Sequence, residues 1–335
     1  MIPAFLGGRY KHVEVLSIIL FALALAPSGF AAPETDSPPR PADPYADPAN
    51  DPYNPLRYIP SNVLTALALV LYLLIALTQM FMMWKIGGKY MTTLVIAECA
   101  FCIGFGFRFA LHSNPESKGI YIAEYLFIIL SPCGFIAADY VLLGRLSRWL
   151  NCDSHLLITP RRITLVFVLS DVVTFLVQAA GGAISISNNV DTAKFGSHLA
   201  LAGLALQLAS FVFFTLVFTL FVFRVYKHEH RIWTRDSGKP IHQDWRILAC
   251  ALLISCVGIL VRSTYRTIEL SQGYLGSLST TEGFFYGLDT LPLFVAVVVY
   301  VPFWPGRFIA DDGEMKRLES VESNTKYMNM VPLNP

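Results

Sequence analysis

Charged side chains are scarce in this sequence. Of its 335 residues, 15% are Asp, Glu, Lys or Arg, whereas soluble domains carry about a quarter. The net charge is +1, and no basic stripe or nucleic-acid motif occurs, so no nucleic-acid partner is expected. Hydrophobic residues make up 54% of the chain. This composition is typical of a protein that crosses a membrane several times.

Several catalytic signatures are also missing. No GxxxxGK[ST] loop is present, so the chain itself is not expected to hydrolyse ATP. The seven histidines lie in the N-terminal run, in loops or at helix ends, and the six cysteines include no zinc set. Cys99 and Cys102 have CxxC spacing inside an apolar helix, where small core residues are the better interpretation. We therefore expect a non-enzyme without cofactor or metal.

The N-terminus resembles a secretory signal. Arg9 and Lys11 precede the run "VLSIILFALALA", followed by small residues suited to cleavage after about Ala31. An uncleaved first span is the alternative, but the run is short for a bilayer core of roughly 30 Å. We therefore expect a signal peptide over 1–31. Residues 32–59 are rich in proline and acidic residues, which predicts a disordered extracellular or lumenal spacer.

Seven long apolar segments follow this spacer. They cover 60–84, 90–111, 119–147, 161–186, 197–225, 246–268 and 282–303. Each is long enough to span a bilayer, and backbone groups in lipid have to be satisfied within the segment, so helices are expected. The predicted fold class is an all-α bundle of seven transmembrane helices over 60–305, with a flexible cytosolic tail over 306–335.

Lys and Arg in the loops predict the orientation. The first, third and fifth loops hold Lys85, Lys89, Arg148, Arg161, Lys227, Arg231, Arg235 and Lys239, and the second and fourth hold Lys118 and Lys194. Cytoplasmic loops carry the excess of positive charge. The N-terminus is therefore expected outside and the C-terminus in the cytosol. The plasma membrane is the preferred location, and a secretory-pathway or vacuolar membrane is the alternative.

Polar residues gather at one depth of the predicted bundle. At about 1.5 Å per residue, the outer half contains Arg108, Glu124, Arg262, Arg266, Glu269, Glu282, Tyr286 and Asp289. Two interpretations stay open. Arg–carboxylate pairs stabilise contacts between helices, or the group lines an outward-facing polar cavity that receives the head group of an amphiphile, since intramembrane ionisable residues commonly mark substrate pathways.

A second polar group lies deeper and has no obvious basic partner beyond Arg145. It comprises Glu98, Asp139, Asp171, Gln178 and Gln207. Carboxyl groups in such positions are found in proton relays of transporters. The pattern therefore suggests an inner polar relay.

These residues fall into motifs that resemble the fungal lipid-translocating exporter family, RTA-like seven-span proteins linked to resistance against toxic sterol analogues and sphingoid long-chain bases. The pattern "R..YR..E" matches Arg262, Tyr265, Arg266 and Glu269, and "E...Y..D" matches Glu282, Tyr286 and Asp289. Further matches are Glu98, Gly104 and Arg108; Pro132, Ala138, Tyr140, Gly144 and Arg145; Asp171, Gln178, Gly181 and Gly182; and Gly203 and Gln207. The resemblance covers about 57–306.

The resemblance implies outward translocation of membrane lipids or other amphiphilic small molecules. Two positions depart from the family pattern: Trp304 stands where a histidine is common, and Gly283 where a tryptophan is frequent. Both differences bear on substrate choice. The sequence leaves the substrate, the energy coupling and the oligomeric state open.

A seven-helix lipid sensor or receptor without transport activity is the main alternative. The third segment ends in "ADYVLLGR" rather than with an Asp-Arg-Tyr motif, and the seventh lacks Asn-Pro-x-x-Tyr. A retinal protein is disfavoured because the seventh segment has no lysine for a Schiff base.

Overall fold

The computed structural model describes residues 43–185, 189–236, 238, 244–273 and 276–309. The chain divides into two units, Met1–Asp43 and Pro44–Pro335, and only the second is described below. The signal peptide predicted for 1–31 and nearly all of the tail predicted for 306–335 lie outside the described residues. Within the described residues all regular secondary structure is helical.

In the part of the chain that the structure describes, six helices are long and apolar enough to cross a membrane. They are α2 (Asn62–Ile86), α3 (Thr92–Ser113, preceded by the short turn η1, Lys89–Met91), α4 (Lys118–Trp149), α5 (Pro160–Ser185), α6 (Val190–His228) and α8 (Trp245–Gln272). Their positions confirm six of the seven apolar segments as helices. Four of them begin at side-chain caps, because Ser61, Ser117, Asn189 and Asp244 accept hydrogen bonds from the first-turn amides.

The seventh apolar segment is not one regular helix. It consists of α9 (Glu282–Phe284), the π-helix η4 (Phe285–Thr290) and α10 (Leu291–Val298), and it ends in turns before η5 (Pro305–Arg307). Pro292 lies at the start of α10. A proline ring clashes with the carbonyl four residues earlier, and the wider π turn before it relieves that clash. At about 1.5 Å per residue, the three pieces cover roughly 25 Å.

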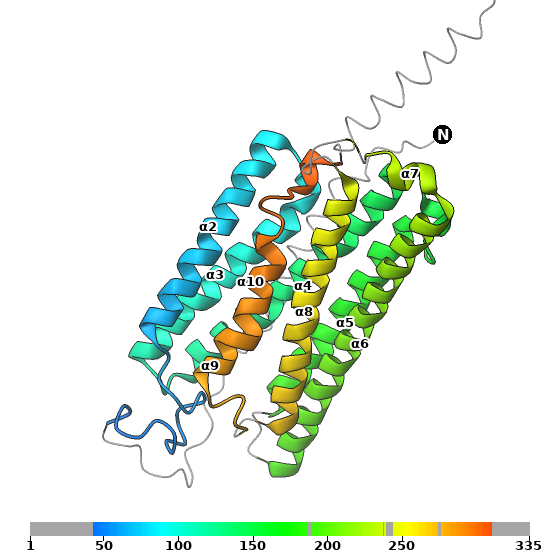
Figure 1. The fold of residues 1–335 in the computed structure, drawn as a ribbon. Coiled ribbons are helices and arrows are strands. Elements are labelled where there is room, and N and C mark those ends of the chain that lie inside the picture. Colours follow the sequence, from blue (N-terminus) through cyan, green and yellow to red (C-terminus); the bar gives the residue numbers. More distant parts are fainter. Residues whose placement is uncertain (1–42, 186–188, 237, 239–243, 274–275, 310–335) are drawn as a thin grey trace, which may run out of the picture. The chain divides into compact units, whose positions relative to one another are not determined.

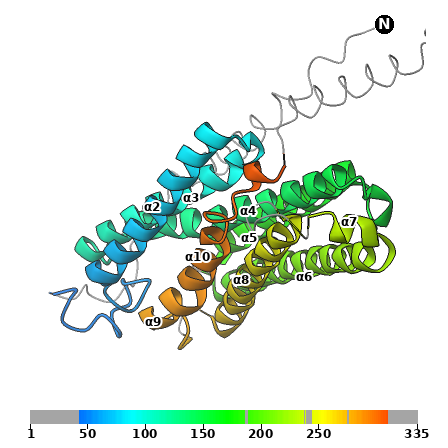
Figure 2. The same ribbon diagram turned by 45° about the horizontal axis from the view of Figure 1, so that its top comes forward.

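The long helices run side by side and form a closed bundle (Figures 1 and 2). Going round it, α2 packs on α3, α3 on α4, α4 on α5, α5 on α6, α6 on α8, and α8 on α10 and η4. The last helix then returns to α2. The short α7 (His230–Thr234) and η2 (Asp153–His155) cap one end, and α9 begins at the other.

Small residues allow two pairs of helices to approach closely. A Cβ atom on Gly181 of α5 would lie 2.3 Å from the Ala200 nitrogen of α6. A Cβ on Gly258 of α8 would lie 2.4 Å from the carbonyl oxygen of Pro292. Such contacts are typical of membrane helices, where small residues bring backbones together. The contact at Gly258 fixes α8 against the seventh segment one turn before Arg262.

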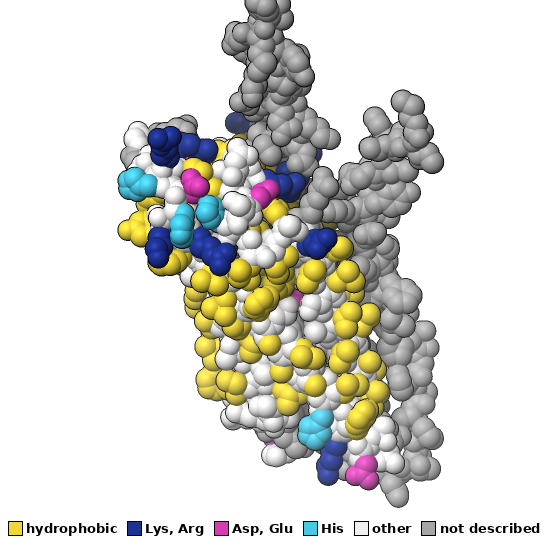
Figure 3. All heavy atoms as spheres, turned by 90° about the vertical axis from the view of Figure 1, so that its right-hand side faces the viewer, with side chains coloured by type: hydrophobic (Ala, Val, Ile, Leu, Met, Phe, Trp, Pro, Cys, Tyr) yellow, Lys and Arg dark blue, Asp and Glu magenta, His cyan; other side chains and the backbone are white. Residues whose placement is uncertain are grey.

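Apolar side chains cover the outside of the bundle. On α5 and α6 the exposed large residues include Leu165, Leu169, Val173, Leu206, Phe213, Leu216, Leu220 and Phe223. Figure 3 shows an apolar band on one side of the molecule, with Lys and Arg gathered beyond the band at the end that carries α7. A surface of this kind suits contact with lipid. The protein is therefore a multi-pass membrane protein.

The described part of the predicted spacer forms turns. From residue 44 the chain forms a series of turns, and both Asp51 and Asn54 are buried. The Tyr45 hydroxyl donates to the carbonyl of Ser113 at the end of α3, over 3.1 Å. Asx turns explain how this proline-rich stretch satisfies its backbone, since the Asn54 side chain accepts from the Leu56 amide at 3.1 Å. Residues 44–59 thus form turns in the structure, and the disordered spacer over 32–59 stays a prediction.

Candidate functional site

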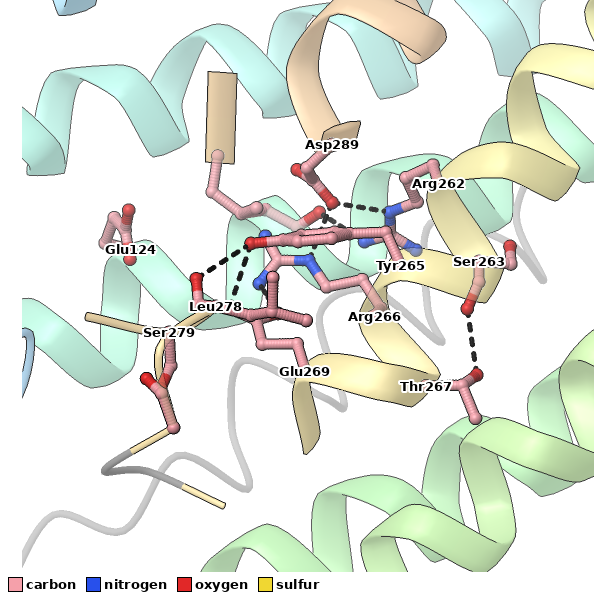
Figure 4. A network of polar contacts seen from close by, with 12 residues as sticks. Glu124, Arg262, Ser263, Tyr265, Arg266, Thr267, Glu269, Leu278, Ser279 and Asp289 are labelled. Carbon is pink, nitrogen blue, oxygen red and sulfur yellow. Dashed lines mark hydrogen bonds and ion pairs between the residues drawn. The ribbon is translucent and has the colours of Figure 1, made fainter. Parts of the chain in front are cut away.

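Two arginines from α8 meet one aspartate of the π-helix (Figure 4). The Nε atoms of Arg262 and Arg266 both donate to Oδ1 of Asp289, over 3.0 and 2.6 Å. Asp289 is fully buried, and the two arginines are 3% and 8% exposed. Spacing of i and i+4 puts the arginines on one face of α8, and the approach at Gly258 brings that face to η4.

The same cluster continues toward the end of α8. Nη1 of Arg266 donates to Oε2 of Glu269 at 2.8 Å, three residues further along the helix. The hydroxyl of Tyr265 donates to the carbonyl of Leu278 over 3.2 Å and lies 3.4 Å from Glu269 Oε1. The "R..YR..E" motif therefore forms one hydrogen-bonded unit that also holds the loop after α8.

A proline in α4 supplies a further acceptor. Pro132 lies inside α4 and has no amide hydrogen, so the carbonyl of Ile128, four residues earlier, loses its helical partner. Nη2 of Arg262 donates to this carbonyl over 3.3 Å. A buried carbonyl without a donor is unfavourable. Arg262 therefore satisfies a group that Pro132 frees, and it joins α4 to the seventh segment.

Arg108 of α3 is the centre of the second cluster. Its Nη1 donates to Glu124 of α4 at 2.9 Å, and its Nη2 lies 3.3 Å from Glu282 of α9. Its Nε donates to the hydroxyl of Tyr286 at 3.2 Å. The Tyr286 hydroxyl also lies 2.9 Å from that of Thr65 on α2. Residues from α4, α9 and η4 thus contact one guanidinium of α3 that is 1% exposed, and α2 joins them through Tyr286.

An aromatic ring connects the two clusters. Phe285 is the first residue of η4, and its ring centroid lies 4.2 Å from the Arg108 guanidinium carbon and 5.5 Å from that of Arg266. A guanidinium over an aromatic face is attracted by about 0.5–2 kcal/mol. The ring thereby reduces the repulsion between two buried cations. All eight residues predicted for the outer group belong to this structure, called here the charged network.

The segment before α2 covers the charged network. The Tyr58 hydroxyl accepts from Arg108 Nη2 at 2.8 Å, and the Ser61 amide donates to Glu282 at 2.8 Å. His112 at the end of α3 lies 2.7 Å from the Pro60 carbonyl. Burial raises the pKa of the Tyr58 hydroxyl, and the Arg108 guanidinium partly opposes this shift. Residues 58–61 therefore occupy partners that a ligand of the network would need.

Charge is unevenly distributed within the charged network. It contains three guanidiniums and four carboxylates, which leaves one negative charge in excess when all are ionised. Glu269 and Glu282 are each 17% exposed in their side chains, whereas the arginines reach at most 10% and Asp289 none. Glu269 and Glu282 therefore lie at the edge of the network, whereas the three arginines, Glu124 and Asp289 lie inside it.

The predicted inner relay is not a connected network in the described part of the chain. Asp139 accepts from Ser255 at 2.8 Å and from Tyr300 at 2.7 Å, and Asp171 accepts from Tyr140 at 2.9 Å. These contacts join α4 to its neighbours at separate points.

The remaining inner residues also stand apart. Gln178 donates to Gln207 at 2.8 Å, which couples α5 to α6. Glu98 is fully buried, and neither of its oxygens has a hydrogen-bond partner among the described residues. Arg145, the expected basic neighbour, lies over the Tyr90 ring at 4.3 Å.

Three contributors were not identified from the sequence. Tyr58 lies in a segment with spacer composition, and nothing in that composition distinguishes it. Phe285 is one apolar residue among many in its segment. The Ile128 carbonyl does have a signal, because a proline in a predicted helix frees the carbonyl four residues before it.

The fold and the network together define a class: an all-helical, multi-pass membrane protein with buried ion pairs at one end of its bundle. Within that class, the chain belongs to the RTA1 family, described as "RTA1 like protein", which it matches over residues 94–312. No solved structure gives a significant match to the chain.

Curated relatives come from Saccharomyces cerevisiae. Protein RTA1 is 33% identical over 204 residues, which is 61% of this chain and 62% of the relative. Protoporphyrin uptake protein 1 is 32% identical over 198 residues, 59% of this chain and 63% of the relative. Sphingoid long-chain base transporter RSB1 is 26% identical over 235 residues, 61% of each. The chain thus spans about three fifths of the length of these relatives.

Proposed function

We propose that this protein moves amphiphilic, lipid-like compounds across its membrane and is not an enzyme. Two relatives support the proposal by name, one as a transporter of sphingoid long-chain bases and one as a protoporphyrin uptake protein. Compounds of this kind combine an apolar body with a polar or charged group. A translocating protein has to give that group a route past the hydrocarbon core, where charge is costly.

The single observation that carries the proposal is the charged network at one end of the bundle. Its seven formally charged groups pair within two clusters that the Phe285 ring connects, and its edge is formed by Glu269 and Glu282. A head group that enters from that end meets carboxylates before arginines. The excess of one carboxylate favours a cationic head group, such as the ammonium of a long-chain base.

Glu282 is the residue we assign to first contact. Its longer ion-pair distance, 3.3 Å to Arg108, and its partial exposure make it the most easily exchanged carboxylate of the Arg108 cluster. An ammonium group there would replace the contacts from Arg108 and the Ser61 amide. Arg108 would keep Glu124 and Tyr286, so no buried charge would be left unpaired during the exchange.

Orientation and location are part of the proposal. We place the charged network at the outer end, because Lys and Arg gather at the opposite end near α7 (Figure 3). The seventh segment is proposed to span the bilayer despite its π-helix, since its length of about 25 Å nearly matches a bilayer core. The plasma membrane is the proposed location.

Transport is tested with purified protein in lipid vesicles. Three fluorescent amphiphiles that share one tail and carry a quaternary ammonium, a hydroxyl or a sulfonate are compared for protein-dependent movement between leaflets. We expect the cation to move at least about tenfold faster than the anion. Glu282→Gln should reduce that preference, whereas Glu116→Gln, in the loop between α3 and α4 and outside the network, should not.

The outcomes separate the hypotheses. Equal rates for vesicles with and without protein, for all three probes, would refute transport. If the cation bound without moving, the protein would instead act as a lipid sensor. Movement with no head-group preference would retain transport and remove the charged network from the site.

A further inference from the structure

Glu98 lies in the first third of α3 and differs from the other buried carboxyl groups described above. It is fully buried, and both carboxyl oxygens lack a hydrogen-bond partner within the described residues. No ion pair reaches it there. In contrast, Asp139 has two hydroxyl donors and Asp289 two guanidiniums. An inaccessible carboxyl group without any donor needs a separate explanation.

The surroundings of Glu98 are apolar and aromatic. One turn further along α3, Phe101 packs edge-on against Tyr72 of α2 at 4.7 Å and against Phe135 of α4 at 6.3 Å. A carboxylate left without partners in such an interior costs several kcal/mol. The uncharged carboxylic acid avoids this cost. In the conformation described, Glu98 therefore holds a proton.

We propose that Glu98 is a proton-binding site that couples proton movement to translocation. The proton is the ligand, the bond that forms and breaks is the O–H bond of the Glu98 carboxyl group, and no redox step is involved. Exchange of one proton for one cationic amphiphile, in opposite directions, leaves the net charge moved at zero. This inference rests on the proposed transport function.

A physical connection to the charged network runs through Tyr72. Its hydroxyl donates to the Thr290 carbonyl of η4 at 2.8 Å, next to Asp289. Its ring also packs at 4.7 Å against Phe101, which lies one turn from Glu98 on α3. When Glu98 loses its proton, the carboxylate requires a donor. The Tyr72 hydroxyl can turn to it only by leaving Thr290, which loosens α2 from the π-helix beside Asp289.

The groups that face Glu98 allow this titration to be isolated. From α2 the neighbouring titratable group is Tyr72, and from α3 itself they are Cys99 and Cys102. Neither α4 nor η1 provides an ion pair to Glu98. Substituting Glu98 by Gln keeps the shape, adds no buried charge and removes the titratable group.

The first experiment measures coupling in vesicles with the quaternary ammonium probe. This probe cannot itself take up or release a proton, so a pH gradient acts on it only through the protein. We expect an imposed gradient of two pH units to accelerate probe movement at least about fivefold in the wild type, with proton counter-movement seen by a trapped pH dye. Glu98→Gln should lose both effects. Glu98→Asp should retain part of them.

The second experiment detects the proton directly. Infrared spectra of the purified protein at neutral pH should contain a protonated-carboxyl band that shifts in D₂O and disappears in Glu98→Gln. Addition of the probe should reduce this band in the wild type. In Tyr72→Phe the band should remain, while the effect of the pH gradient is lost, because the donor that links Glu98 to Thr290 is gone.

Several results would overturn the proposal. If the wild-type rate of probe movement were the same with and without the pH gradient, the coupling would be refuted and the transport function would stay intact. An infrared band unchanged in Glu98→Gln would refute the proton site, whether or not transport occurs. If no vesicle moved the probe, the transport function would fail, and an unchanged band on probe addition would then also refute Glu98 as a ligand-linked site.

Discussion

Replacing Asp289 by Asn should destabilise the protein more than any other single removal of charge from the network. One oxygen of Asp289 accepts from two guanidiniums at 3.0 and 2.6 Å, and the residue is fully buried. Asparagine keeps an oxygen there but has no charge. Arg266 would retain Glu269, whereas Arg262 would retain only the carbonyl of Ile128.

The expected magnitude follows from this loss of pairing. Breaking a buried ion pair by removing one partner costs about 3–5 kcal/mol, because the other charge stays buried. Asp289→Asn is therefore expected to lower the free energy of unfolding by roughly that amount. The matched control is Glu269→Gln, which removes a partly exposed i, i+3 partner of Arg266. Such pairs contribute at most about 1 kcal/mol.

Reversible unfolding by SDS in mixed micelles, followed by tryptophan fluorescence, measures both values. A loss below about 1 kcal/mol for Asp289→Asn, equal to the control, would contradict the reasoning. It would mean that Arg262 is solvated or finds another partner. A parallel measurement of probe movement separates a folded but inactive variant from an unfolded one.

Three further predictions concern the packing and the cover of the network. Pro132→Ala restores a helical amide for the Ile128 carbonyl, so we expect unchanged or increased stability in the SDS assay together with slower probe movement; wild-type movement would disprove a role for the freed carbonyl. Gly258→Ala should destabilise by about 1–3 kcal/mol through overpacking, whereas Gly106→Ala, where a Cβ meets nothing within 4 Å, should stay within about 0.5 kcal/mol. Burial favours the neutral Tyr58 hydroxyl and raises its pKa. The contribution of this hydroxyl to the free energy of unfolding is therefore present below the unfolded pKa of about 10 and is lost as pH rises through the folded pKa. Tyr58→Phe should remove this alkaline loss of stability, and a pH profile of stability identical to that of the wild type would contradict the prediction.

The sequence predicts the helices because hydrocarbon leaves the backbone few choices. Apolar runs of more than 20 residues have to form their hydrogen bonds internally, and six of the seven expected segments are continuous helices. The seventh deviates for a local reason. Pro292 is visible in the sequence, but the close contact between its carbonyl and Gly258 depends on how two helices pack. A hydropathy pattern carries no information about that packing.

The charged network was predictable as a set, and its pairing was predictable only between the sixth and seventh segments. Depth along each helix brings Arg262 and Asp289 to one level, and the structure joins them. The partner of Arg108 depends on how α3, α4 and α9 are rotated, which depth alone does not determine. For the inner group, depth along the helices does not predict which side chains make contact. Asp139 accepts from Ser255 and Asp171 accepts from Tyr140, so in the described part of the chain these two carboxyl groups form separate local contacts.

The contacts between α2 and the seventh segment have a consequence for biosynthesis. Tyr72 and Gln79 lie inside the first described helix, yet their acceptors are carbonyls of Thr290 and Val297, each 218 residues later. Trp304 donates to the carbonyl of Gly87 across a similar separation. While the ribosome is still producing the intervening helices, the polar side chains of α2 have no final partner in the lipid. Assembly therefore ends when the seventh segment docks on α2. A chain shortened before residue 282 would leave the polar side chains of α2 exposed to lipid without these partners, and we expect cellular quality control to recognise it.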